Sequence, residues 1–196
     1  MLNSISESKS KIFVISSPSG GGKTSIVKRI LKEIPELVFS VSATTRPKRK
    51  DEINGVDYYF ITEQEFKEKI EKNDFIEWEM FYDYYYGTPK ESVTKALSED
   101  KSVLLELDVN GALNVKKIFT DAILIFIDVP SFEELVQRLK SRNTESDSDL
   151  QKRIERAKME LKQKDKFDYI FVNKNLNDVT NEIKNLIKKI LKGDEK

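Results

Sequence analysis

The sequence predicts an α/β protein with a doubly wound parallel sheet, because short apolar runs alternate with longer amphipathic segments. The runs at 12–16, 103–107, 123–127 and 169–172 have the length of strands and are apolar on both faces. Such strands are buried between two layers of helices. The second indication is a glycine-rich turn directly after the first run, since a strand, such a turn and a helix form a phosphate-binding loop, or P-loop.

The phosphate-binding loop consists of Ser17, Pro18, Ser19, Gly20, Gly21, Gly22, Lys23 and Thr24. Adjacent glycines let the backbone bend tightly and turn its N–H groups toward the α- and β-phosphates of a nucleotide. The following helix adds the positive end of its dipole. Lys23 is placed to reach the β- and γ-phosphates, and the Thr24 hydroxyl to ligate Mg²⁺. A flexible Gly/Ser turn with an incidental lysine is the alternative.

Ser17 stands where the pattern GxxxxGK[ST] has its first glycine. A serine would be strained there if the backbone needed a positive φ. Ser17 therefore implies either an extended conformation or a looser loop. The residues after the loop have the spacing of an amphipathic helix, which is the context that the motif requires; the apolar ones are Ile26, Ile30, Leu31 and Ile34.

The segment 39–100 has a different character, because it is rich in Tyr and Phe and holds only short strand-like pieces. These pieces lie at 39–43, 58–61 and 75–80. We expect an inserted, substrate-binding subregion with a mixed sheet.

Two arginines of this subregion, Arg46 and Arg49, lie three residues apart beside Pro47. Two guanidinium groups can bind one phosphate from two sides. A solvated basic loop is the alternative, because Lys48 and Lys50 extend the run of charge.

Helix starts are indicated by polar residues with capping spacing. Thr62 with Glu65, and Ser131 with Glu134, have the spacing of a capping box, and Asp178 precedes an amphipathic run at the C-terminal end. The stretch 141–149 is polar throughout, so we expect it to be mobile.

The composition excludes several kinds of chemistry. Among 196 residues there is no Cys and no His, so thiol nucleophiles, disulfides, imidazole bases and Cys/His zinc sites are excluded. Any metal must be a hard cation held by oxygen. Lys+Arg and Asp+Glu both number 34, so we expect a mononucleotide rather than a nucleic-acid polymer as the phosphate partner. The longest apolar run, 122–127, is too short to cross a bilayer, and we expect a cytoplasmic protein.

A series of short motifs then occurs in a recognisable order. The motifs are SxSxTTRxxR at 40–49, Glu52, GVDYYF at 55–60, FIEW at 75–78, YYG at 85–87 and ELDVNGA at 106–112. From about residue 12 to the last helix, the chain resembles guanylate kinases, which transfer the γ-phosphate of ATP to GMP. The resemblance implies ATP as co-substrate, GMP as acceptor and Mg²⁺ as cofactor.

The resemblance also implies how GMP is bound. Its phosphate is held by Arg46, Arg49, Tyr58 and Tyr86, and its base is read by Ser42, Glu77 and Thr88; Glu52, Glu106 and Asp108 complete the substrate site. The chemistry agrees, because one carboxylate can accept both the N1–H and the 2-amino group of guanine, and a hydroxyl suits its O6. Adenine has an acceptor at N1. The alternative for Glu77 is an ordinary solvent-facing carboxylate of a strand.

On the ATP side, the implied binding residues are those of the loop with Ser25, Arg138 and Asn173. Arg138, Arg142 and Arg153 match the lid arginines of the family, although each alone could be a surface charge. Asp108 matches an acidic residue that organises Mg²⁺ together with Thr24, and capping of a helix is its structural alternative. The implied catalytic residues are Lys23, Arg46, Asp108, Arg142 and Arg153.

No side-chain base is required by this mechanism, because a GMP phosphate oxygen is already largely ionised at neutral pH, with a second pKa near ~6.

We expect one domain over 1–196, with a core of 11–38, 101–140 and 154–196, a GMP-binding subregion of 39–100 and a lid of 141–153. The oligomeric state, monomer or homodimer, stays open.

Two rival functions are weighed against this one. A catalytically inactive binding module, like the guanylate-kinase-like domains of scaffold proteins, would have lost the ATP-side groups. These groups are all present here: Gly22, Lys23, Thr24, Asp108, Arg142 and Arg153. A P-loop kinase for another phosphorylated molecule, such as a ribose bisphosphate, would leave Ser42, Glu77 and Thr88 idle.

Overall fold

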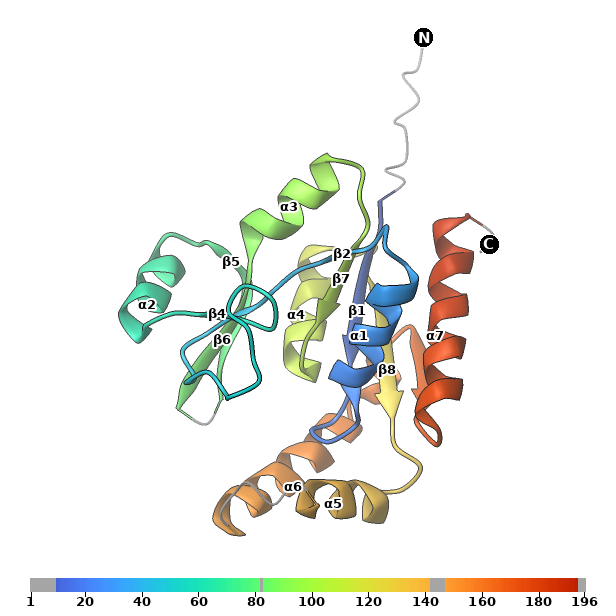
Figure 1. The fold of residues 1–196 in the computed structure, drawn as a ribbon. Helices are drawn as coiled ribbons and strands as arrows, with labels where there is room; N and C mark the ends of the chain where they lie inside the picture. Colours follow the sequence, from blue (N-terminus) through green and yellow to red (C-terminus); the bar gives the residue numbers. More distant parts are fainter. Residues whose placement is uncertain (1–9, 82, 142–146, 194–196) are drawn as a thin grey trace.

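The computed structural model describes residues 10–81, 83–141 and 147–193. Its centre is a sheet of five parallel strands in the order β2-β7-β1-β8-β9 (Figure 1). The strands are β1 (Ile12–Ser16), β2 (Val38–Phe39), β7 (Val103–Glu106), β8 (Ile123–Asp128) and β9 (Tyr169–Val172). The four long apolar runs of the sequence are therefore strands of one parallel sheet, as predicted.

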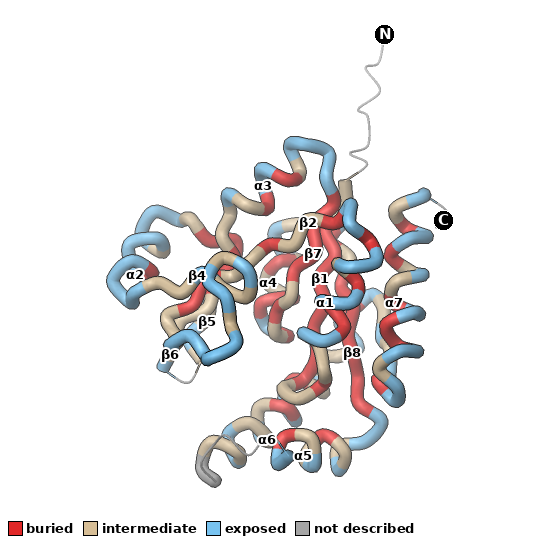
Figure 2. Tube along the Cα trace, in the orientation of Figure 1, coloured by how far each residue is buried: buried red, intermediate tan, exposed pale blue. Residues whose placement is uncertain are grey.

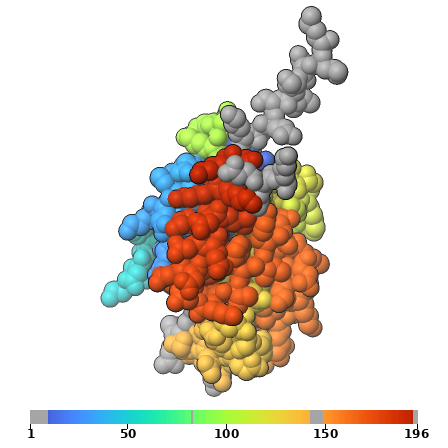
Figure 3. Space-filling model, turned by 90° about the vertical axis from the view of Figure 1, so that its right-hand side faces the viewer, coloured from blue at the N-terminus to red at the C-terminus, as the bar shows by residue number. Residues whose placement is uncertain are grey.

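Helices cover both faces of this sheet, which explains why its strands are apolar on both sides. Phe13 and Ile15 point to one face, where they pack with α1 (Lys23–Glu33) and α7 (Leu176–Leu191). In Figure 3, α7 lies across this side of the molecule beside α1. The three central strands β1, β7 and β8 are buried along most of their length (Figure 2), whereas the edge strand β9 leaves Ile170 and Val172 exposed.

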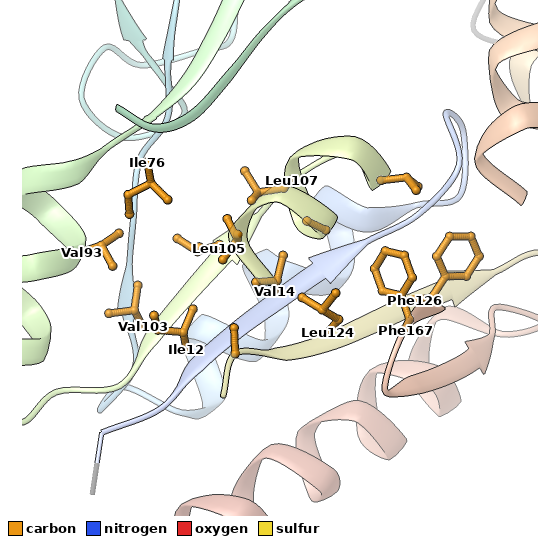
Figure 4. Close-up of a cluster of buried hydrophobic side chains, with 14 of the residues drawn as sticks. Ile12, Val14, Ile76, Val93, Val103, Leu105, Leu107, Leu124, Phe126 and Phe167 are labelled. Atoms are coloured by element: carbon orange, nitrogen blue, oxygen red, sulfur yellow. The ribbon is translucent and has the colours of Figure 1, made fainter. Parts of the chain in front are cut away.

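The opposite face packs against α3 (Lys90–Ser98) and α4 (Val109–Ile118). Ile12 and Val14 point into this second layer (Figure 4). Ile76, which comes from the other sheet, joins the same cluster beside Val93. Ile76 thus anchors the substrate-binding subregion to the core.

The expected insertion forms a mixed sheet in the order β4-β3-β6-β5. Its strands are β3 (Ala43–Thr44), β4 (Tyr59–Phe60), β5 (Phe75–Phe81) and β6 (Tyr84–Pro89). Helix α2 (Glu63–Glu71) covers one face, where Phe66 stacks on Phe75 and Tyr85. The other face of β5 and β6 is left for the site described below.

The strand expected at 39–43 was wrong as a single element. Val38–Phe39 pairs with β7 in the core sheet, whereas Ala43–Thr44 pairs with β6 in the mixed sheet. The chain crosses between the sheets at 40–42, because the N–H of Ser40 still bonds to Leu104 of the core while the carbonyl of Ser42 already accepts from Tyr59. Apolar periodicity does not reveal such a change of partner.

The helix starts follow the predicted caps with one correction. Thr62 and Glu65 form a complete capping box, and Ser131 caps α5 (Phe132–Lys140). Helix α7, however, begins before Asp178, because the side chain of Asn175 accepts the N–H groups of Asn177 and Asp178.

The expected lid, 141–153, falls partly on residues 142–146, which lie outside the described part of the chain. Residues 147–153 are the first turns of α6 (Asp147–Leu161). A short 3₁₀ turn (Lys164–Lys166) connects α6 to β9. Over the described ranges of the chain, no helix is both long and apolar enough to span a bilayer.

Candidate active site

The phosphate-binding loop has the backbone that its glycines predicted. Gly20 and Gly22 have φ values of 89° and 92°, a conformation that side chains disfavour. The N–H of Gly21 donates to the carbonyl of Pro18 at 2.9 Å, which closes the turn. The loop then leads directly into α1 at Lys23.

Ser17 fits the loop without backbone strain. It is not among the described residues with positive φ, so the serine avoids the strained backbone conformation. Its side chain is buried, and its hydroxyl donates to the carbonyl of Pro18 at 3.0 Å. A Cβ atom on Gly21 would lie 2.7 Å from Cβ of Ser17, so a serine at position 17 requires a glycine at 21.

The end of β7 lies beside the start of α1, as expected for a ligand site at the carboxyl edge of a parallel sheet. Lys23 Nζ donates to the carbonyl oxygen of Leu107 at 2.6 Å, and Thr24 Oγ1 donates to Glu106 Oε1 at 2.5 Å. Asp108 caps α4, because its Oδ1 accepts the N–H of Gly111 at 2.6 Å. Its other carboxylate oxygen faces the cavity side, where it meets Arg156.

Glu77 is buried, with 8% of its surface exposed, so the solvent-facing alternative for this carboxylate is wrong. The hydroxyl of Thr88 donates to its Oε1 at 2.6 Å. Burial raises the pKa of Glu77 to about 7, and the charge of Asp108 acts in the same direction. A Cβ atom on Gly111 would lie 2.8 Å from Glu77 Oε2, so this glycine makes room for the carboxylate.

Glu52 organises the two-arginine loop. Arg46 binds it with both terminal nitrogens, at 2.9 and 2.7 Å, and the backbone N–H of Arg49 donates to it at 2.8 Å. The hydrogen bond from Arg46 holds the pKa of Glu52 below its ordinary value. The Arg46 guanidinium also lies 5.4 Å from the ring centre of Tyr58. Arg46 is thus fixed, while the Arg49 side chain is 64% exposed.

Tyr58 and Tyr86 meet edge to face, with ring centres 6.1 Å apart. Burial raises the pKa of Tyr58 above its ordinary value, so its hydroxyl stays protonated and can donate. Both tyrosines line the same cavity as Arg49 and the P-loop.

One cavity of about 290 Å³ brings most of the predicted residues together. Those that line it are Ser17, Pro18, Ser19, Gly20, Gly21, Gly22, Lys23, Thr24, Ser25, Ser42, Arg49, Tyr58, Glu77, Tyr86, Glu106, Asp108 and Arg153. Arg46, Glu52 and Thr88 contact lining residues instead of lining it themselves.

Of the residues predicted for ATP, Asn173 contacts the loop, and Arg138 in turn contacts Asn173. Asn173 Nδ2 donates to the carbonyl of Gly21 at 2.9 Å, and Arg138 donates to the carbonyl of Asn173 at 2.9 Å and to Glu134 at 2.5 Å. Their contact with ATP stays a prediction. Arg142 lies outside the described residues.

The sequence reasoning gave no site role to five lining residues: Glu79, Phe81, Gly87, Arg156 and Glu160. Arg156 donates through Nη2 to Glu79 Oε1 at 2.7 Å and to Asp108, and through Nε to Glu160 Oε1 at 2.8 Å. Its guanidinium carbon lies 3.9 Å from the ring centre of Phe81. Burial, together with the hydrogen bond to Asp108, raises the pKa of Glu79.

A signal for part of this group exists in the sequence. Residues 77, 79 and 81 alternate along β5, so they share the face that carries Glu77. Arg156 and Glu160 are four apart and share one side of α6, but nothing in their spacing indicates which other segment they meet.

The fold and the site together define a P-loop nucleotide-binding protein with a second binding region beside the loop. A family model described as guanylate kinase matches residues 9–190. The chain therefore belongs to the guanylate kinase family.

Individual relatives agree with this family. A guanylate kinase of Thermotoga maritima is 45% identical over 180 residues, covering 92% of this chain and 87% of the relative. A guanylate kinase of Chlorobium chlorochromatii is 47% identical over 178 residues, covering 90% of this chain and 94% of the relative. The crystal structure of guanylate kinase from Anaplasma phagocytophilum superimposes with a TM-score of 0.78 at 30% identity, covering 93% of this chain and 86% of that one.

Proposed function

We propose that the protein transfers the γ-phosphate of ATP to GMP, giving ADP and GDP. One observation carries the proposal: the phosphate-binding loop and the buried carboxylate Glu77 line the same cavity. A donor phosphate on the loop and a guanine on Glu77 would therefore face each other within one site. Membership of the guanylate kinase family supports the same reaction.

Glu77 is proposed to select guanine. Its Oε1 already accepts from Thr88, and as a carboxylate it has further lone pairs for the N1–H and 2-amino groups of the base. Ser42 lines the same cavity and can donate to O6. Adenine, with an acceptor at N1, would leave the buried carboxylate without donors, which costs more than losing one hydrogen bond in water.

The phosphate of GMP is proposed to lie between Arg49, Tyr58 and Tyr86. Arg46 lies next to them and is already oriented by Glu52, so its N–H groups can bind a phosphate with little loss of side-chain conformational freedom. The Arg49 side chain is largely exposed and lies 4.0 Å from Glu52, and we propose that it closes on the same phosphate.

The phosphates of ATP are proposed to occupy the loop from Ser17 to Ser25. Lys23 is held at the end of β7 by the Leu107 carbonyl, so its charge is already located where the γ-phosphate would lie. Arg153 lines the cavity from α6 and would add positive charge on the opposite side. Asn173, Arg138 and Arg142 remain assigned to the ATP side by family resemblance alone.

Mg²⁺ fits the oxygen groups at this point. The Thr24 hydroxyl and the Asp108 carboxylate are hard donors, and Glu106 bonds to the same hydroxyl. Within the described part of the chain no three acidic side chains form a complete cage, which suits an ion that keeps several waters and shares its ligands with phosphates. When bound, Mg²⁺ neutralises charge on the phosphates of ATP.

The residues then act by alignment and charge. Lys23 and Arg46 orient the donor and acceptor phosphates and stabilise charge on the group in transfer. The nucleophile is a phosphate oxygen, so no side chain has to remove a proton. We also propose that 39–100 serve as the GMP-binding subregion of a single domain and that 141–153 close over ATP.

A coupled assay of ADP release tests the reaction and the acceptor together. The purified protein is given ATP and Mg²⁺ with GMP, AMP, CMP, UMP or a ribose bisphosphate in parallel. Turnover with GMP alone is expected. Turnover with another acceptor, or none with any acceptor in a sample that still binds GMP, would refute the proposal.

A further inference from the structure

Arg156 lies where three separate parts of the molecule meet. Its partners are Glu79 of the mixed sheet, Asp108 at the start of α4, and Glu160 of its own helix. Its side chain is 18% exposed, so it is largely enclosed by these groups. Neither the P-loop pattern nor the residues assigned above give it a role.

The contacts of Arg156 continue to the phosphate-binding loop. Glu160 accepts Nε of Arg156 at 2.8 Å on one carboxylate oxygen and the backbone N–H of Ser19 at 2.9 Å on the other. Glu160 is itself buried. A continuous path of hydrogen bonds therefore runs from the loop, through Glu160 and Arg156, to Glu79 on β5.

The hydrogen-bond path is separate from the apolar contacts that hold α6 against α5. The apolar side of α6 packs on α5, where Ala157 and Ile154 join Leu135 and Leu139 (Figure 1 shows the two helices together). Toward β5, by contrast, Arg156 contributes an ion pair of 2.7 Å and a contact with the ring of Phe81. A polar, directional link thus joins α6 to the GMP side of the cavity.

The guanidinium group suits this position better than an ammonium group would. It is planar and offers several donors in fixed directions, so Nε binds Glu160 while Nη2 binds both Glu79 and Asp108. Its flat face lies on Phe81. Without this cation, three carboxylates would face one another beside the place where the phosphates of both substrates must bind.

We propose that Arg156 is a positioning residue that couples the two substrate sites by holding Glu79 of the GMP side at a set distance from the P-loop. The inference rests on the proposed function, since it concerns the relative placement of ATP and GMP. Phosphoryl transfer depends on aligned donor and acceptor phosphates, and small misplacements are costly. Binding of one nucleotide thereby favours the geometry that binds the other.

The test measures this coupling directly. The dissociation constant of GMP is determined by calorimetry with and without a non-hydrolysable ATP analogue and Mg²⁺, for the wild-type protein, R156A, E79A and the double variant. Lys152→Ala is the matched control on the same helix, because Lys152 is 66% exposed and pairs only with its helical neighbour Asp149 among the described residues. Steady-state kcat and KM are measured on the same samples.

In the wild-type and K152A proteins, the analogue is expected to tighten GMP about tenfold, within the usual range of site-to-site coupling. R156A should reduce this factor to about one and lower kcat at least tenfold, while GMP alone binds within about threefold of wild type. E79A should behave similarly, the double variant should be no worse than R156A, and R156K should restore part of the coupling.

An unchanged coupling factor in R156A or in E79A overturns the inference, as does an absence of coupling in the wild type. If R156A does not fold, E79A decides, since it leaves α6 untouched. Failure of the wild-type protein to phosphorylate GMP would instead refute the proposed function, so the two failures are distinguishable.

Discussion

The affinity for GMP is expected to depend on pH through Glu77. Burial raises the pKa of this carboxyl from its ordinary value of 4.5 to about 7. Guanine presents donors, so it binds the ionised form, and protonation competes with GMP. Affinity should therefore be high above pH 7 and fall as the pH drops through 7, which is a range where most glutamates do not titrate.

The magnitude follows from the ionised fraction. With a pKa of about 7, roughly nine tenths of Glu77 is ionised at pH 8 and roughly one tenth at pH 6, so the dissociation constant should rise about tenfold between these values. The phosphate of GMP has its own second pKa near ~6, which adds a factor of about two.

Glu77→Gln separates the two contributions. The amide cannot accept both guanine donors, so at pH 8 we expect a loss of about 2 kcal/mol, or about 30-fold in affinity. Between pH 8 and pH 6 the variant should weaken by only the twofold that belongs to the phosphate. Calorimetric titrations with GMP at half-unit intervals from pH 5.5 to 8.5 measure both profiles.

Parallel profiles for wild-type protein and E77Q would refute this reasoning, because they would show that another group governs the pH dependence. Unchanged GMP affinity in E77Q at pH 8 would mean that guanine is read elsewhere.

Three further outcomes are expected. Lys23→Ala should lower kcat about 10²–10³-fold, because it removes a fixed charge from the phosphoryl group, while GMP still binds within about twofold in calorimetry. Gly111→Ala should weaken GMP at least tenfold, because its Cβ would lie 2.8 Å from Glu77 Oε2, although α4 itself should be no less stable. Because the pKa of Glu77 is raised in the folded state, protonation of this carboxyl contributes about 3 kcal/mol to the free energy of unfolding. This contribution is complete below pH 4.5 and is lost as the pH rises through 7. In urea unfolding, E77Q should not show this loss.

Each of these has its own check. Full activity of K23A would show that Lys23 does not act on the transferred phosphoryl group. The control for Gly111→Ala is Asn110→Ala, on the exposed side of the same helix, which should bind GMP normally. Equal GMP affinity in these two variants would show that a side chain fits at position 111. A free energy of unfolding that changes equally with pH in E77Q and wild type would contradict the burial argument.

Much of the fold could be predicted because it depends on local pattern. Short runs that are apolar on both faces, such as residues 123–127, are typical of strands between two helical layers. The capping spacing of Thr62 and Glu65 depends on one turn of backbone, so it identified the start of α2. The strand at 39–43 failed because its two halves pair with different sheets, and pairing partners lie outside the segment.

The candidate site could likewise be predicted where it depends on a short stretch of sequence, and not where it depends on distant segments. The sequence by itself determined the P-loop and the motif residues, because a phosphate cradle needs adjacent glycines, a lysine and a hydroxyl in one short stretch of chain. It also left the backbone conformation of Ser17 open, and in the structure this residue does not adopt a positive φ.

Only the tertiary structure decided which carboxylates are buried and which charges meet. The pKa of Glu77 is raised because the folded chain buries this carboxyl and brings Asp108 near it, while the hydrogen bond from Thr88 acts in the opposite direction. Arg156 entered the site because α6 packs on α5 in a way that directs it to Glu79 and Asp108, residues far from it in the sequence. Burial and ion pairing are properties of surroundings, and those surroundings come from distant segments that no local pattern specifies.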